Sequence, residues 1–168
     1  KEYFESGNSL VITILFAILI VYLVLAAQFE SFRKPLAIIL TVPIALTAGL
    51  YTLFLTGASI NVYSQIGFLM LIGLITKNGI LVVEFANQLR EKGMSVDEAI
   101  FESSLIRLRP VLMTTISTLL GAVPLVLSSG AGAESRYAMA VVVLGGITLS
   151  SLITLYLVPA LYRLLERK

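Results

Sequence analysis

Long apolar runs separated by short polar segments dominate the chain. Five runs reach or approach the length of about 20 residues that an α-helix needs to cross the hydrocarbon core of a bilayer. They cover residues 9–27, 36–56, 66–88, 108–128 and 137–161. The first of them contains no charged residue. The pattern therefore predicts an all-α integral membrane protein whose fold is a bundle of five transmembrane helices.

Two prolines at the second run should act differently. Pro35 stands at its start, where a proline suits the first turn of a helix. Pro43 lies inside the run and is expected to kink the helix. Membranes tolerate such a kink when neighbouring groups satisfy the carbonyl that the proline leaves free.

Between the third and fourth runs the sequence becomes strongly polar. Residues 89–109 hold four cations and four acids. Ser95 and Glu98 have the spacing of a capping box, which indicates a helix start. We expect an amphipathic helix over residues 95–106, either lying on the membrane surface or solvated as a loop helix.

Composition agrees with a membrane location and narrows the chemistry. The chain is 58% hydrophobic and 13% charged, with a mean hydropathy of +0.97. It has no cysteine and no histidine, which excludes disulfides, thiolate metal sites and imidazole chemistry within these residues. The net charge of +2 does not indicate a nucleic-acid partner. No phosphate-binding loop, metal-ligand pair or nucleophile with a base is present, so neither an enzyme with catalytic residues nor a metal site is expected.

The cations of the loops predict an orientation. Nine Lys and Arg residues fall in residues 28–35, 89–109 and the C-terminal end, against only Lys1 and Arg136 on the opposite side. The positive-inside rule then places the N-terminus outside and the C-terminus in the cytoplasm, as five spans require. The odd number of spans and the missing initiator methionine lead us to expect a piece of a longer polypeptide.

Lys77 lies at the middle of the third run, about 16 Å from either end of the helix. A lysine at that depth costs about 2.5–3.5 kcal/mol to insert, and such residues normally face a bundle interior, a partner or a wet cavity. Gly67, Gly73 and Gly79 would let another helix approach this run closely.

Glu84 shares a helix face with Lys77 because seven residues make nearly two turns. Asn78 and Asn87 flank this polar stripe. One interpretation is a structural ion pair between Lys77 and Glu84 that fixes helix packing. The other is a proton relay, in which the lysine responds to the protonation of nearby acids; Glu84 and Asn78 would then be secondary relay or packing residues.

Arg107 and Thr114 in the fourth span are also seven residues apart and share a face. The neighbouring hydroxyl residues are expected mostly to bond their own backbone. No span contains an aspartate. A mid-membrane lysine without a nearby carboxylate is incomplete, so we infer that its acidic partners lie on a helix outside these residues.

Several motifs occur together in one order: AAQFESF, NVYSQIG, GLITKNGILVVEFANQ, RLRPVLMTT and GAVPLVLSSGAGAESR. Through these motifs and their order, the whole chain resembles the C-terminal membrane half of resistance-nodulation-division (RND) efflux pumps. The likeness is to the hydrophobe/amphiphile, or multidrug, branch. The resemblance implies that residues 1–168 form the last five of twelve membrane helices in a drug/proton antiporter.

The resemblance also implies roles and partners. Lys77, Arg107 and Thr114 would belong to the proton relay, with two aspartates supplied by the N-terminal half of the same polypeptide. The pump would be a homotrimer in the bacterial inner membrane, working with a periplasmic adaptor protein and an outer-membrane channel. It would export amphiphilic small molecules by proton-motive force, without a cofactor.

Two alternatives stay open within the same superfamily. A pump for monovalent heavy metals would have a similar membrane half. A non-transporting membrane scaffold or protein-export accessory would keep the helices without needing the relay.

Overall fold

The computed structural model describes residues 2–166, with side chains from residue 11 onward. Lys1, Arg167 and Lys168, which contribute to the charge asymmetry, lie outside the described residues. The helices are α1 (Glu2–Gln28), α2 (Lys34–Ile39), α3 (Val42–Thr56), α4 (Val62–Glu91), α5 (Val96–Val126) and α6 (Ala133–Glu166). They provide five apolar segments long enough to cross a membrane, with α2 and α3 sharing one of them. The expected fold class, an all-α membrane bundle, is confirmed.

The second span is broken rather than merely bent. Helix α2 ends at Ile39 and α3 begins at Val42, with Pro43 in its first turn. Proline has no N–H to donate, so the helical ladder loses one backbone bond at Pro43, where this span breaks. At the break, the buried hydroxyl of Thr41 and the backbone N–H of the same residue both donate to the carbonyl of Ile38, at 2.6 and 3.0 Å.

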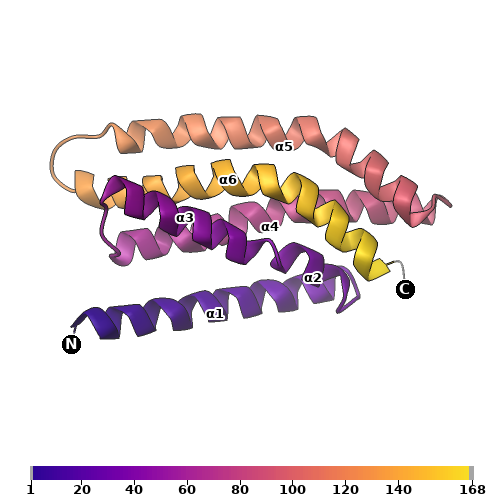
Figure 1. Ribbon diagram of the computed structural model, residues 1–168, viewed down its shortest axis with the longest axis horizontal. Coiled ribbons are helices and arrows are strands. Elements are labelled where there is room, and N and C mark those ends of the chain that lie inside the picture. Colours follow the sequence, from indigo (N-terminus) through magenta and orange to yellow (C-terminus); the bar gives the residue numbers. More distant parts are fainter. Residues whose placement is uncertain (1, 167–168) are drawn as a thin grey trace.

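The segment that follows α4 differs from one expectation. Residues 95–106 are the first part of α5, which continues without interruption into the span expected at 108–128. Ser95 and Glu98 form the expected capping box, with the two backbone N–H bonds both at 3.3 Å. After this start no residue ends the helix. Pro110 removes only one backbone bond, and a helix of this length bends instead of stopping; Figure 1 shows the bend toward the α4–α5 loop.

Helix α6 lies at the centre of the bundle, with α5 on one side and α3 and α4 on the other (Figure 1). Two apolar clusters hold these helices together. One, toward the C-terminal end of α6, includes Leu25, Ile38, Val83, Val158 and Tyr162. The other, toward the opposite end, includes Ala45, Phe68, Leu71, Val142 and Ile147.

Of the three glycines expected to let another helix approach α4 closely, two do so in the structure. A Cβ atom at Gly79 would lie 2.9 Å from Cγ2 of Ile38, and one at Gly67 would lie 3.0 Å from the carbonyl oxygen of Met139. At Gly73 nothing lies within 4 Å among the described residues. Gly67 and Gly79 therefore bring α6 and α2 close to α4, while Gly73 faces open space.

Helix α1 is attached mainly by its C-terminal part. Leu25 is fully buried, whereas Leu15, Phe16 and Leu19 are all at least half exposed. Helix α1 therefore contributes little to the core of residues 2–166, and its apolar surface suits contact with lipid or with another helix.

Candidate functional site

Lys77 lies at mid-height of α4 on a face that the other described helices leave open. Its side chain is exposed and lines a cavity of about 300 Å³ between α1 and α4. The rest of that cavity is almost entirely apolar, with Val21, Val24, Ile80 and Leu81 in its walls. An ammonium group in apolar surroundings at this depth requires a polar partner or water.

A second, smaller cavity joins Lys77 to α5. It measures about 30 Å³ and is lined by Lys77 and Asn78 from α4 together with Thr114, Thr115 and Thr118 from α5. Its volume is enough for one water molecule, which needs about 10–15 Å³. The structure therefore brings three of the predicted site residues, Lys77, Asn78 and Thr114, to one polar cavity between two helices.

The hydroxyls of this cavity donate mainly within their own helix. Thr114 Oγ1 donates to the carbonyl of Val111 at 3.0 Å, and Thr118 Oγ1 donates to the carbonyl of Thr114 at 2.8 Å. This agrees with the expected backbone bonding of the hydroxyl residues. Each hydroxyl oxygen keeps lone pairs that can accept a bond from an ammonium or a water.

Arg107 does not reach that cavity. It lies two helical turns from Thr114, about 10 Å along α5, and its guanidinium carbon stands 4.7 Å from the ring centroid of Phe85 on α4. Its Nε atom is buried with no hydrogen-bond partner among the described residues. Sequence reasoning did not identify Phe85, because a contact between helices depends on their relative rotation.

Glu84 is exposed on α4. Among the described residues, the ion pairs join Arg90 to Glu166 and Arg163 to Asp97, and neither Lys77 nor Glu84 takes part. The interpretation in which these two residues pair to fix helix packing therefore has no support in the geometry.

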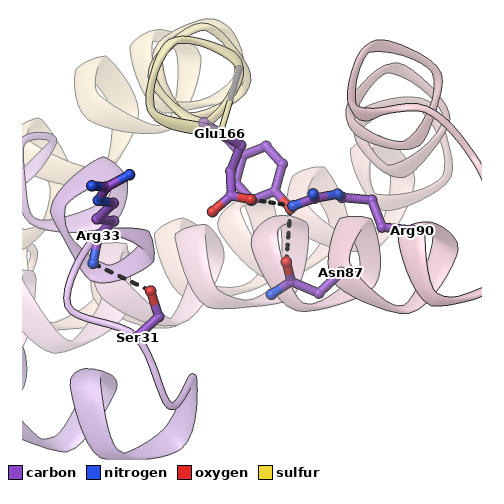
Figure 2. A network of polar contacts seen from close by, with 6 residues as sticks. Ser31, Arg33, Asn87, Arg90 and Glu166 are labelled. Carbon is purple, nitrogen blue, oxygen red and sulfur yellow. Dashed lines mark hydrogen bonds and ion pairs between the residues drawn. The ribbon is translucent and has the colours of Figure 1, made fainter. Parts of the chain in front are cut away.

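A polar cluster that sequence reasoning missed ties the end of α4 to the end of α6. Figure 2 shows Asn87 and Arg90 on α4 facing Glu166 on α6. Tyr162 donates to Asn87 Oδ1 at 2.7 Å, and Arg90 forms an ion pair with Glu166 and donates to the Tyr162 hydroxyl at 3.5 Å. The same-face spacings were a usable signal, since Asn87 and Arg90 are three apart and Tyr162 and Glu166 are four apart. The cluster is structural, because its members mostly satisfy one another.

Five apolar helices and an ionisable group held at mid-membrane define a multi-pass membrane protein. A sequence profile of the AcrB/AcrD/AcrF family matches residues 1–166, and the chain belongs to this family. The resemblance to RND pumps is thereby confirmed.

Curated relatives match almost the whole chain. It is 43% identical to the multidrug resistance protein MdtC of Erwinia tasmaniensis and 42% identical to MdtC of Escherichia coli, over 97% of the chain in each case. It is 39% identical over 96% of the chain to an uncharacterized transporter of Haemophilus influenzae. The matched region spans only 16% of the length of each of these relatives.

Proposed function

We propose that this chain is the C-terminal membrane segment of a proton-driven multidrug efflux transporter, and that Lys77 is the centre of its proton relay. The family and the MdtC relatives support the transporter class. The relay is proposed from the position of Lys77. Its ammonium is expected at mid-membrane, lines two cavities and pairs with no carboxylate among the described residues.

The missing carboxylates would come from the N-terminal half of the same polypeptide. With both aspartates ionised, the ammonium is held between them by charge attraction. When a proton neutralises them, the attraction weakens and the lysine turns toward other acceptors. Asn78 and Thr114 line the small cavity together with Lys77, and their side-chain oxygens can serve as these acceptors.

In this proposal Arg107 and Glu84 act farther from the small cavity than Asn78 and Thr114 do. Arg107 stands nearer the cytoplasmic end, where a fixed cation raises the barrier for other cations and orients water. Its contact with Phe85 fixes its position. Glu84, being exposed toward the same end, is a secondary relay or packing residue.

The complete protein would be a homotrimer in the bacterial inner membrane that passes amphiphilic substrates to a periplasmic adaptor and an outer-membrane channel. The proton-motive force would drive it, and no cofactor is required. The cation asymmetry supports an orientation with the N-terminus of this chain in the periplasm and its C-terminus in the cytoplasm.

The test is substrate/proton antiport by the full-length transporter in proteoliposomes with an imposed pH gradient. Lys77→Ala should abolish antiport while leaving insertion and assembly unchanged, because removal of the charge lowers the insertion cost. Lys92→Ala, which removes an exposed loop cation, is the matched control and should transport normally. Normal antiport by Lys77→Ala would refute the relay, whereas absence of antiport by the unmodified full-length protein would favour the scaffold alternative.

A further inference from the structure

A long groove runs between α5 and α6 on the part of the bundle toward the cytoplasmic end. It has a volume of about 690 Å³, and its walls are mainly apolar, with Leu105, Leu108, Leu152 and Tyr156 among them. These side chains are all exposed, from 38% for Leu108 to 82% for Tyr156. This apolar surface is built by two neighbouring helices and lies away from Lys77.

The groove ends in a pair of opposite charges. Arg163 on α6 binds Asp97 on α5 through two nitrogens, with Nε to Oδ1 at 2.6 Å and Nη2 to Oδ2 at 2.9 Å. Their side chains are 51% and 46% exposed, so both can still bind a further group. A guanidinium has five N–H donors and a carboxylate about four acceptor sites, so the pair retains both functions.

The dimensions match one leaflet of a bilayer. From Asp97 to Leu112 at its far end, the groove follows about 22 Å of α5, at 1.5 Å per residue. Half of the hydrocarbon core is about 15 Å thick, and the headgroup region adds several ångströms. The groove has its charges at the loop end and apolar walls beyond them. A lipid of the cytoplasmic leaflet has its headgroup and acyl chains in the same order.

We propose that this groove binds a zwitterionic phospholipid with a primary amine, of the phosphatidylethanolamine type. The acyl chain lies along the leucines, the phosphate accepts from Arg163, and the ammonium donates to Asp97. A purely anionic headgroup could bind Arg163 but has no ammonium to donate to Asp97. A choline headgroup has no N–H to donate, and a peptide strand would find few partners for its backbone along these walls.

The proposal does not depend on the proton relay and can fail or succeed separately. The first experiment reconstitutes the full-length transporter in phosphatidylcholine–phosphatidylglycerol vesicles that contain phosphatidylethanolamine with a photoreactive diazirine on its acyl chain. Irradiation followed by peptide mass spectrometry should place the label on the α5 and α6 residues of the groove.

Ala160→Phe fills the groove and should lower labelling there about fivefold or more. Ala27→Phe makes the same change at an exposed site on α1 and should leave it unchanged. Equal labelling in the two variants overturns the site. Absence of label from the groove with every lipid also overturns it, and would mean that another part of the polypeptide covers this surface.

A second comparison tests headgroup recognition. Arg163→Gln and Asp97→Asn should each reduce labelling by phosphatidylethanolamine about fivefold, whereas Arg109→Gln, an exposed cation outside the groove, should not. Unlabelled phosphatidylethanolamine should compete better than phosphatidylcholine or phosphatidylglycerol. Equal competition by all three would overturn the assigned headgroup.

Discussion

The guanidinium carbon of Arg107 on α5 lies 4.7 Å from the ring centroid of Phe85 on α4. A cation over an aromatic face is attracted by about 0.5–2 kcal/mol, with the larger values where water is excluded. The Nε atom of Arg107 is buried without a hydrogen-bond partner among the described residues, so the ring is the main contact that holds this side chain. Phe85 is therefore a positioning residue for Arg107.

Phe85→Leu should slow proton-coupled transport about threefold to tenfold, because it removes the ring face while keeping an apolar side chain. Phe85→Trp should retain transport, since tryptophan offers a stronger face. The measurement is antiport rate as a function of pH in proteoliposomes of the full-length protein. Phe54→Leu, at an exposed position on α3, is the control; if both leucine variants behave alike, Arg107 does not need the ring.

The cluster at the ends of α4 and α6 should contribute measurably to stability. Tyr162→Phe removes the donor to Asn87 Oδ1 and leaves that half-buried oxygen without its protein partner, so we expect a loss of about 0.5–1.5 kcal/mol. Combined with Asn87→Ala in a double-mutant cycle, the two changes should be coupled by about 1 kcal/mol. Thermal unfolding in detergent measures this, and strictly additive effects would show that the bond contributes nothing.

Among the glycines of the described residues, Gly145 leaves the least room for an added Cβ atom. A Cβ atom there would overlap the side chain of Thr52 on α3, which is held by a 2.9 Å bond from its Oγ1 to the carbonyl of Ala48. Gly145→Ala should destabilise the protein by about 1–3 kcal/mol through overpacking. Gly121→Ala faces open space and should be neutral or stabilising by up to about 1 kcal/mol. A melting temperature for Gly145→Ala at or above that of Gly121→Ala would contradict the predicted close packing.

Two adjacent serines on α5 provide a matched test of bonds between helices. Ser103 donates to the carbonyl of Val82 on α4 at 2.6 Å, whereas Ser104 donates to Ile100 of its own helix. Ser103→Ala should cost about 0.6 kcal/mol, and at most about 1.7 kcal/mol, as is usual for such bonds in membranes. Ser104→Ala should cost less. Protection of the α5 N-terminal amides from hydrogen exchange would report the difference, and a larger effect at Ser104 would refute the anchoring role of Ser103.

The helices could be predicted from the sequence because length and hydropathy alone distinguish a membrane span. Pro43 predicted a kink, which the structure shows as a break before Val42, and Ser95 and Glu98 predicted the start of α5. The continuity of α5 did not follow, since a polar segment before a proline is equally typical of a helix end. That α5 passes through it depends on packing against α4 and α6.

Contacts between helices could not be predicted from the sequence, for a different reason. Seven-residue spacing correctly places Lys77 and Glu84 on one face of a helix, but it says nothing about which helix stands opposite. Thr114 faces the same cavity as Lys77, whereas Arg107 faces Phe85, although both lie on one face of α5. Pro110 lies between these two residues inside α5, and a proline in a helix interior allows the two parts of the helix to approach α4 at different angles.

The close approach of Ile38 to Gly79 sets an order of events during biosynthesis. Helix α2 precedes α4 in the chain and enters the bilayer first, so at that stage Gly79 is not yet opposite Ile38. Membrane helices insert first and pack afterwards, and the broken second span gains its support only when α4 arrives. A nascent chain arrested before Gly79 would therefore carry the break at Thr41 without the surface that holds it in place.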